Sequence, residues 1–484
     1  MACALLKQTY PNITFLPDDE GYKAENEVSW STQAWLGPAC IFTPPSANEL
    51  SFAVKALTNT STPFAMRGGG HMPIADAANI NSTGVLISST KLNTLKLSED
   101  KGTMSIGPGP RWGDVFTYLD GTDLTIVGGR LGPVGVPGLL LGGGISYYSY
   151  KHGLGSAGGK IKSYEAVLAD GTIATVTGDN EYSDLHWALR GGGNSFALIT
   201  RFDLQTFYAG TPLMAEAKYA ETESTKDAWL AAVLNFALNG DQDTAAAITP
   251  VARWGPNFTA PSYESTLFYN GTVAPTTGPF ASFYGNGTEL QAVNGSSTLR
   301  PITLAAYGKA VREAFKPGGL GYGFRQKFRV VSTKATKEAL DIVHDTFFSK
   351  LEESGIPNPL PGFFTGLAFN AVTKTMAEQS ADSPQGLDPE PAFWVEESLT
   401  WKNEADDAEI EEWVRSVNKE IEKRLVEVDG KSRYVYLNDA DKGQEVFKAY
   451  GEENLTRLKE IRGKYDPGRV FTDLMPGGFK VEHS

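Results

Sequence analysis

The sequence predicts an α+β protein with more than one domain. Its 484 residues exceed what a single ordinary hydrophobic core accommodates. Near the N-terminus, a helix and then a strand lead into a run of three glycines, an arrangement suited to a nucleotide. From about residue 210 to about residue 430, strand-like and helix-like patterns alternate, which predicts an antiparallel sheet backed by helices.

Composition argues against several classes of partner. Hydrophobic residues make up 41% and charged residues 21% of the chain, as in globular proteins. The net charge is −14 and no Lys/Arg cluster occurs, which argues against nucleic acid or an acidic membrane surface. No apolar run approaches the roughly 18 residues of a membrane span, and the N-terminus lacks the apolar core of a signal peptide. We therefore expect no nucleic acid, no membrane and no metal as partner.

Glycosylation sequons and cysteines indicate a secreted chain. Eight N-x-[ST] sequons occur, where about three are expected by chance. The two cysteines, Cys3 and Cys40, favour one disulfide at the N-terminus, and two unrelated thiols remain the alternative. We expect an extracellular location, N-glycans and a signal peptide removed ahead of Met1. The sequons lie at Asn12, Asn59, Asn81, Asn257, Asn270, Asn286, Asn294 and Asn454.

The first 208 residues carry the patterns of short strands and helices. No regular element is expected before residue 39. Ser46 and Glu49 match a capping box that opens an amphipathic helix. Asp170-Gly171, between two β-rich runs, predicts a type I′ hairpin turn. Strands are expected at 39–42, 63–66, 84–88, 103–107, 163–168, 172–176 and 196–202, and further helices from 111 and over 180–189.

The central motif of this half is Arg67-Gly68-Gly69-Gly70-His71, directly after the strand at 63–66. Three glycines let the backbone approach a ligand closely and leave N–H groups free to bind phosphate. His71 then lies at the exit of an anion site. A flexible glycine turn with a surface histidine is the alternative.

Residues 128–159 are unusually rich in glycine. Apolar residues such as Val134, Val136 and Leu140 are interleaved, which a solvated linker would not carry, so we expect buried backbone against a flat ligand. The stretch from Gly153 to Gly158 matches G-x-G-x-x-G. No clear strand precedes it and no helix follows it, so a Rossmann site is disfavoured.

The second half is predicted to alternate strands and helices. Alternation along the last strand of the sheet places Trp394 and Glu396 on one side and Glu397 on the other. A strand at 434–439 and two helical stretches then close the chain. Strands are expected at 213–219, 263–269, 324–331, 363–369 and 393–401, and helices at 228–238, 335–351 and 404–426.

Four separated blocks carry a resemblance to a known family: residues 67–71, residues 134–144, residues 169–171 and residues 184–193. Through them, residues 38–208 and 431–480 resemble FAD-linked oxidases of the vanillyl-alcohol oxidase, or p-cresol methylhydroxylase, type. The likeness is to the subgroup around berberine bridge enzyme and the fungal oligosaccharide oxidases. Two positions depart from the family pattern. Leu131 replaces a Cys that often forms a second flavin bond, and Ala197 replaces a glycine near the cofactor.

This resemblance implies a two-part FAD-binding domain of the vanillyl-alcohol oxidase type and an antiparallel-sheet substrate domain backed by helices. The FAD-binding domain would take residues 1–208, with its p-cresol methylhydroxylase-type core at 38–208, and a C-terminal return at 431–484. The substrate domain would take 209–430. FAD is expected to be covalently attached through His71 only. The expected cofactor-binding residues are Arg67, Gly68, Gly69, Gly70, His71, Met72, Val134, Gly135, Val136, Gly138, Gly142, Gly143, Gly144, Gly153, Gly155, Ile199 and Asn438.

Three residues are candidates for catalysis. Tyr436, in a Y-x-N pattern with Asn438, is the first candidate for the base, provided that its surroundings lower its pKa from about 10. His152 and Glu396 are the others. An ordinary strand aromatic at Tyr436 and a solvated, salt-bridged Glu396 are the alternatives. In the relatives, the position of Val134 is associated with oxygen access to the flavin.

These expectations describe a secreted FAD-linked oxidase. It would take hydride from an alcohol or similar C–H of a small organic or carbohydrate substrate to flavin N5 and reduce O2 to H2O2. A dehydrogenase with a non-oxygen acceptor, an oxidative cyclase of secondary metabolism and a non-catalytic flavin carrier would share the same motifs. The substrate itself cannot be inferred from the fold.

Overall fold

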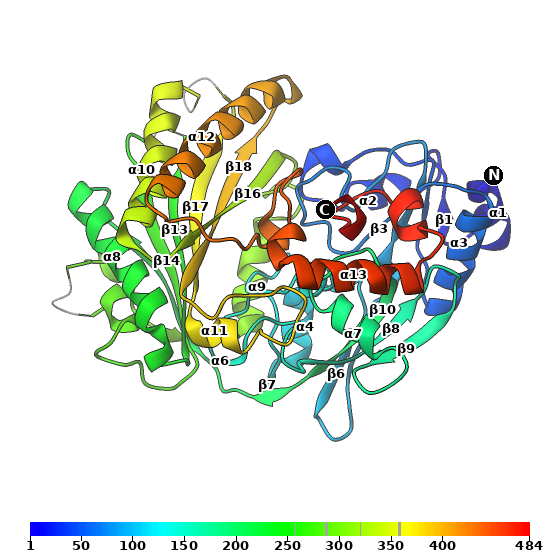
Figure 1. The fold of residues 1–484 in the computed structure, drawn as a ribbon, viewed down its shortest axis with the longest axis horizontal. Coiled ribbons are helices and arrows are strands. Elements are labelled where there is room, and N and C mark those ends of the chain that lie inside the picture. The colour runs from blue at the N-terminus through cyan, green and yellow to red at the C-terminus, as the bar shows by residue number, and fades with distance from the viewer. Residues whose placement is uncertain (257, 286–288, 320, 357–359) are drawn as a thin grey trace.

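The computed structural model describes residues 1–256, 258–285, 289–319, 321–356 and 360–484, so the sequons at Asn257 and Asn286 lie outside the described residues. The chain forms two lobes that lie side by side (Figure 1). One lobe contains both termini and the smaller sheets, and the other contains one large sheet. The predicted α+β class is confirmed. In the described part of the chain, no helix is both long enough and apolar enough to cross a membrane.

The regular elements alternate along the chain. The helices are α1 (Ala2–Thr9), α2 (Tyr22–Asn26), α3 (Ala47–Asn59), α4 (Trp112–Leu119), α5 (Val136–Leu141), α6 (Ser149–His152), α7 (Ser183–Leu189), α8 (Glu223–Asn239), α9 (Leu304–Glu313), α10 (Lys337–Ser354), α11 (Lys374–Glu378), α12 (Asp407–Glu427) and α13 (Glu452–Tyr465). The strands are β1 (Thr14–Phe15), β2 (Cys40–Phe42), β3 (Phe64–Arg67), β4 (Val85–Ser88), β5 (Leu95–Leu97), β6 (Thr103–Ile106), β7 (Leu124–Thr125), β8 (Ile161–Val167), β9 (Ile173–Thr177), β10 (Leu198–Gln205), β11 (Phe207–Tyr208), β12 (Leu213–Tyr219), β13 (Ala246–Trp254), β14 (Ser262–Tyr269), β15 (Arg300–Pro301), β16 (Arg325–Lys334), β17 (Phe364–Val372) and β18 (Ala392–Trp401).

The first lobe holds two principal sheets. A four-stranded sheet has the order β1-β2-β4-β3, parallel except for β1, and β3 delivers the chain to the glycine motif. Ser46 caps α3 as predicted, since its Oγ accepts the N–H of Asn48 at 3.2 Å. A five-stranded antiparallel sheet has the order β5-β6-β10-β8-β9.

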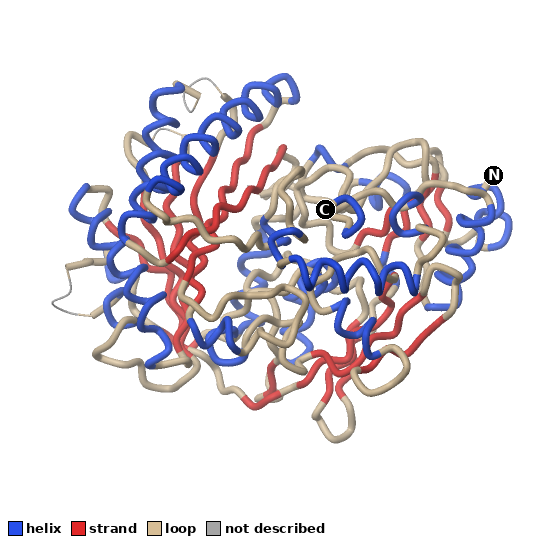
Figure 2. The backbone as a smooth tube through the Cα atoms, in the orientation of Figure 1, coloured by secondary structure: helices blue, strands red, loops and turns tan. Residues whose placement is uncertain are grey.

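The second lobe is the predicted antiparallel sheet backed by helices. Its seven strands have the order β15-β12-β14-β13-β17-β18-β16. Helices α8, α10 and α12 cover the outer face, and the other face is turned toward the first lobe (Figures 1 and 2). Along β18, Glu397 is fully buried and accepts a hydrogen bond from Asn418 of α12 at 2.8 Å. Glu396 therefore points to the opposite side, toward the first lobe, and the predicted alternation is confirmed.

Residues 22–36, here called the N-terminal arm, lie between the lobes. The N–H of Trp30 donates to the carbonyl of Gly70 at 3.3 Å. On the other side, Gly323 donates to the carbonyl of Trp30 at 3.0 Å and Thr32 to the carbonyl of Phe324 at 2.9 Å. The predicted Cys3–Cys40 disulfide is present and ties α1 to β2 at the start of the first lobe.

The chain after residue 430 returns to the first lobe, where α13 lies beside α7 (Figure 1). Tyr450 donates to the carbonyl of Gly191 at 2.9 Å, and buried Lys480 donates to Asn194 Oδ1 at 2.9 Å. The first lobe is thus built from two segments that are far apart in sequence.

Several local predictions are wrong. The first 40 residues are not irregular, because α1, β1 and α2 form there. The turn at Asp170-Gly171 does join β8 to β9, but only Gly171 has a positive φ, of +81°, so the turn is not type I′. Two backbone hydrogen bonds instead match a three-residue loop: Gly171 donates to the carbonyl of Leu168, and Leu168 donates to the carbonyl of Thr172.

Three elements differ from the sequence patterns. Residues 434–436 belong to no strand, and a 3-10 turn, Leu437–Asp439, replaces the rest of the expected strand. Strand β13 was not predicted, because Pro250 lies in its middle and proline removes a ladder donor. Helix α9 was also missed.

Candidate active site

Arg67 is the last residue of β3 and directly precedes the three glycines of the motif. Its side chain is fully buried, and it donates to Glu25 Oε2 at 3.0 Å and to Ser88 Oγ at 2.8 Å. Burial lowers the pKa of Arg67 to about 10, and Glu25 partly opposes this decrease. Arg67 therefore fixes the loop from inside the protein and does not line the cavities described below.

The three glycines are required by close backbone contacts. A Cβ on Gly68 would stand 2.4 Å from Pro137 Cγ, and one on Gly69 would stand 2.4 Å from the Cα of Gly135. Gly70 has φ of +67° and lies against Ser29. The motif is thus packed against the start of α5, and no side chain fits between them.

The next residue, His71, has an imidazole ring that is held in one orientation and is uncharged. The ring stacks on Trp30 with centroids 4.4 Å apart and planes 13° apart. Burial, and then the positive charge of Arg111, lower the pKa of His71 to about 3. Its Nδ1 is buried without a hydrogen-bond partner. The imidazole is therefore uncharged at physiological pH and has an unused polar atom.

Two adjoining cavities meet at this motif. The first, mostly apolar, passes from Gly68 along α5 toward the end of the chain. The second lies between the motif and the open face of the large sheet. Both are bordered by Gly68, Met72, Ala78, Gly138 and Asn438, so the two cavities adjoin at these residues and are described together as the cavity region.

Most of the predicted cofactor residues border the cavity region. They are Gly68, Gly69, Gly70, His71, Met72, Val134, Gly135, Gly138, Gly142, Ile199 and Asn438. Arg67, Val136, Gly143, Gly144, Gly153 and Gly155 do not border it. The last four pack against protein instead: a Cβ would meet Gln385 at 2.4 Å from Gly143, Leu139 at 2.7 Å from Gly144, Gln379 at 2.7 Å from Gly153 and Val127 at 2.7 Å from Gly155.

The residues present fit a flavin nucleotide. A narrow apolar channel leads to a glycine motif with close backbone access, as a dinucleotide cofactor requires. Near the motif, His71 Nδ1, Trp30 Nε1 and Asn79 Oδ1 are buried without partners. Buried polar groups are nearly always paired, and His71 and Asn79 border the second cavity, so their two unpaired atoms fit a polar group bound there.

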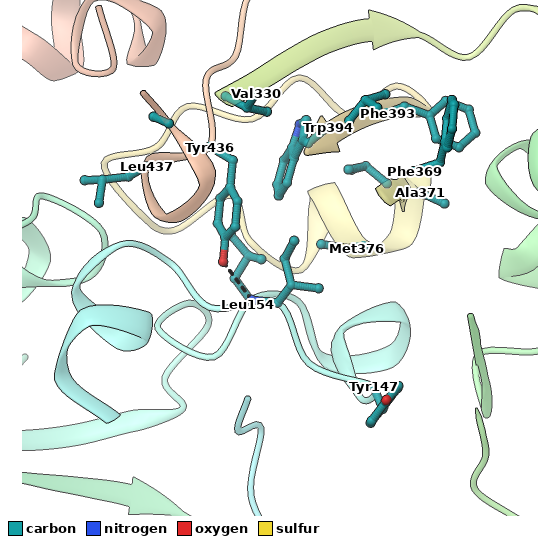
Figure 3. Packing of buried hydrophobic residues seen from close by; sticks show 14 of the residues in the cluster. Tyr147, Leu154, Val330, Phe369, Ala371, Met376, Phe393, Trp394, Tyr436 and Leu437 are labelled. Atoms are coloured by element: carbon teal, nitrogen blue, oxygen red, sulfur yellow. Dashed lines mark hydrogen bonds between the residues drawn. The ribbon is translucent and has the colours of Figure 1, made fainter. Parts of the chain in front are cut away.

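Tyr436 borders the second cavity but is poorly suited to be a base. Its ring stacks on Trp394 at 5.0 Å (Figure 3), and its oxygen accepts the N–H groups of Ile145 at 3.1 Å and Asn438 at 3.0 Å. Burial raises the pKa of Tyr436, so the lowered pKa that Tyr436 would need in order to act as a base is not found in this structure. Because two donors occupy its lone pairs, the hydroxyl has only its proton to offer to a ligand.

Carboxyl groups next to Tyr436 are better proton acceptors. Glu396 and Asp439 both border the second cavity, together with Arg130. Burial raises the pKa of each carboxyl, and Glu396 raises that of Asp439 further, while Arg130 lowers both. Like-charged carboxyls that border one cavity favour holding one proton between them. Glu396 is half-buried and forms no ion pair within the described residues, so it is not the salt-bridged residue of the alternative interpretation.

Arg130 and Asp439 were missed by sequence reasoning. Arg130 crosses to the second lobe, where it donates to Thr249 Oγ1 at 3.1 Å and Asn370 Oδ1 at 2.8 Å. Asn370 in turn donates to Asp439 at 3.4 Å. The only sequence signal was position: Arg130 follows the pair Gly128-Gly129, and Asp439 follows Asn438.

His152 lies away from both cavities. It packs against Phe207 at 4.6 Å at the end of α6, and burial with Lys160 and Lys151 lowers its pKa to about 4. The structure does not bring His152 together with Tyr436 and Glu396.

Comparison with known proteins supports the cofactor assignment. Residues 38–177 match the FAD binding domain family model, and residues 433–473 match the berberine and berberine-like model. The FAD-dependent monooxygenase prx3 of Penicillium roqueforti is 32% identical over 501 residues, covering 100% of this chain and 94% of that protein. A second relative, the FAD-dependent monooxygenase AOL_s00215g279 of Arthrobotrys oligospora, is 30% identical and covers 99% of this chain and 89% of its own length.

A solved structure shows the same fold. The xylooligosaccharide oxidase from Myceliophthora thermophila C1 superposes with a TM-score of 0.75 at 18% identity, covering 99% of each chain. The expected vanillyl-alcohol oxidase type of fold with a berberine-bridge-like substrate lobe is confirmed.

Proposed function

The chain belongs to the berberine-bridge-enzyme-like family of FAD-linked oxidoreductases, and on that basis we propose that it is an oxidase of small organic substrates. It takes hydride from an alcohol carbon or a similar C–H, and O2 is the final acceptor. The observation that carries this proposal is the second cavity, where a hydroxyl donor and two carboxyls meet beside the glycine motif.

FAD would be held along the first cavity and bound covalently through His71 alone. A neutral imidazole with an unused Nδ1 supports a bond at this residue. Leu131 borders the second cavity at the position of the second anchor and cannot form a thioether. Denatured protein should keep one FAD on the His71 peptide by mass spectrometry, and complete release of the flavin would contradict the attachment.

The bound flavin would accept hydride at N5 and so carry the redox chemistry. The chain supplies positioning and proton transfer. Tyr436 donates its hydroxyl proton in a hydrogen bond to the substrate oxygen, which orients the reacting carbon. The pair of Glu396 and Asp439 accepts the proton that leaves the substrate hydroxyl, and Arg130 favours the ionised form of the pair that can accept it.

The names of the two relatives favour monooxygenation as a second candidate. Purified protein should be screened with alcohols, phenols and glycans under 18O2, with peroxide detection and product mass analysis. An oxidase gives a product two hydrogens lighter and labelled peroxide. A product that gains one 18O atom would identify a monooxygenase, and turnover that needs an added dye or quinone would identify a dehydrogenase.

Secretion remains part of the proposal. The Cys3–Cys40 disulfide fits an oxidising compartment, and the sequon residues Asn12, Asn59 and Asn81 are exposed. Asn454 is less accessible, because it is half-buried and donates to the carbonyl of Tyr450 at 3.2 Å. Glycosidase treatment of protein secreted from a fungal host should lower its mass.

A further inference from the structure

The N-terminal arm closes the glycine motif from outside the matched FAD-binding segment. Ser29 lies against Gly70, and Trp30 lies against His71. Both arm residues precede position 38, where the family model begins. Backbone bonds from Trp30 to Gly70 and from Gly323 to Trp30 fix this part of the arm to both lobes. The N-terminal arm therefore forms part of the proposed cofactor site.

Trp30 holds the imidazole plane of His71. The two rings are stacked, with centroids 4.4 Å and planes 13° apart. Phe315, just after α9, contacts the same ring with centroids 5.4 Å and planes 54° apart. Rotation of the imidazole would break the stack, so its two nitrogens keep fixed directions.

Arg111 is the cation beside this ring. It donates to the carbonyls of Pro133 at 2.5 Å and Val28 at 3.5 Å, and its Nη1 stands 3.5 Å from the position of a Cβ on Gly69. Its positive charge opposes a second positive charge on His71.

The other charged groups near the motif have partners of their own. Arg312 is paired with Asp114, which also accepts the N–H of Arg111, and Arg67 is paired with Glu25. Neither carboxylate is therefore an ion-pair partner of His71.

We propose that Trp30 is a positioning residue that holds the imidazole of His71 for bond formation with the flavin. The inference rests on the proposed attachment through His71. The new bond replaces one C–H of the flavin 8α methyl group and one N–H of the imidazole. The two protons and two electrons released are taken up by O2 as H2O2. An uncharged ring retains the nitrogen lone pair that forms the bond.

The test measures attachment and needs no substrate. The full chain is produced in a riboflavin-starved host, FAD is added, and covalent flavin is followed by fluorescence on denaturing gels and by intact mass. Non-covalent FAD binding is measured on the same samples. Trp30→Phe should attach FAD at close to the wild-type rate. Trp30→Leu should be about tenfold slower with FAD still bound, as expected when a stacking interaction that fixes orientation is lost.

Trp35→Leu is the matched control for the arm. Trp35 packs on Tyr322 at 5.7 Å and donates to the carbonyl of Ser29 at 2.9 Å. If Trp35→Leu slows attachment as much as Trp30→Leu, or if Trp30→Leu attaches FAD at the wild-type rate, the positioning role is overturned. Should Trp30→Leu fail to bind FAD at all, Trp30→Met repeats the comparison. Wild-type protein without covalent flavin would refute the attachment at His71 itself.

Discussion

Removal of the charge on Glu25 tests how the glycine motif is held. The carboxylate accepts hydrogen bonds from Arg67 at 3.0 Å and Ser88 at 2.7 Å, and the Glu25 carbonyl accepts another from Arg67 at 2.5 Å. Glu25→Gln keeps the volume of the side chain and the carbonyl contact. The fully buried guanidinium would then lack its only ion-pair partner within the described residues.

The expected loss of stability follows from this burial. Even with Glu25 present, the pKa of Arg67 falls from 12.5 to about 10. At ~1.36 kcal/mol per pKa unit, keeping Arg67 charged already costs about 3 kcal/mol. Breaking a buried ion pair costs about 3–5 kcal/mol. Because the Glu25 side chain is 17% exposed, water reduces this loss, and we expect about 2–3 kcal/mol. For a lobe of about 260 residues, the melting temperature should fall by about 4–6 °C.

Thermal unfolding at pH 7, monitored by near-ultraviolet circular dichroism, measures this loss of stability as a lower melting temperature of the first lobe. Glu27→Gln is the control, because Glu27 lies on the same arm and pairs with exposed Lys23 at 3.9 Å. Such a surface pair contributes about 0–1 kcal/mol. If Glu25→Gln melts within about a degree of this control, the backbone contacts alone hold Arg67, and the reasoning from the ion pair is refuted.

Four further substitutions test the site and the sheet. Glu396→Gln should slow the reduction of the flavin by substrate at least about 100-fold, with FAD retained. In the wild type this rate should rise with pH, because burial raises the pKa of Glu396 and only the ionised form accepts a proton. Stopped-flow absorbance measures both effects. Tyr436→Phe should slow the same step about tenfold through loss of one hydrogen bond, and an unchanged rate would remove Tyr436 from the mechanism. Val134→Leu should slow reoxidation of the reduced flavin by air and leave its reduction nearly unchanged; equal reoxidation rates would contradict a role in oxygen access. Glu397→Gln should add about 3 kcal/mol to the free energy of unfolding at pH 8 and little at pH 4.5. The pKa of Glu397 in the folded protein, about 7, exceeds the ordinary 4.5, so wild-type stability falls as the pH rises between these two values. Equal stabilisation by Glu397→Gln at pH 4.5 and pH 8, measured by urea unfolding, would refute this reasoning.

The glycine motif and the large sheet were predictable because their signals are local. Three glycines after a strand and alternation along 393–401 each depend on neighbouring residues alone. The same alternation correctly placed Glu396 and Glu397 on opposite sides. The G-x-G-x-x-G match at 153–158 was correctly set aside on its context, and Gly153 packs against Gln379 instead.

The rest of the site depends on contacts between distant segments. Trp30 reaches His71 from the N-terminal arm, and Arg130 reaches Asn370 across 240 positions of sequence. The pKa of Tyr436 could not be inferred either, because its rise comes from burial under Trp394 and from the fold around it. Local patterns therefore predict the glycine motif of the proposed cofactor site, whereas the proposed proton-handling groups can be identified only from the tertiary structure.

The return of the chain after residue 430 also sets an order of events during biosynthesis. The cavities use Asn438, Gly478 and Phe479 as well as residues near position 70. Asn438 donates to the carbonyl of Leu139 at 3.1 Å, so the C-terminal segment forms part of the wall. Until residues 438–479 have been synthesised and folded, this wall is missing and the proposed FAD site is incomplete. At the FAD site proposed above, loading of the cofactor therefore follows the synthesis of residues 438–479, and the supply of FAD where these residues fold determines how much of the protein becomes holoenzyme.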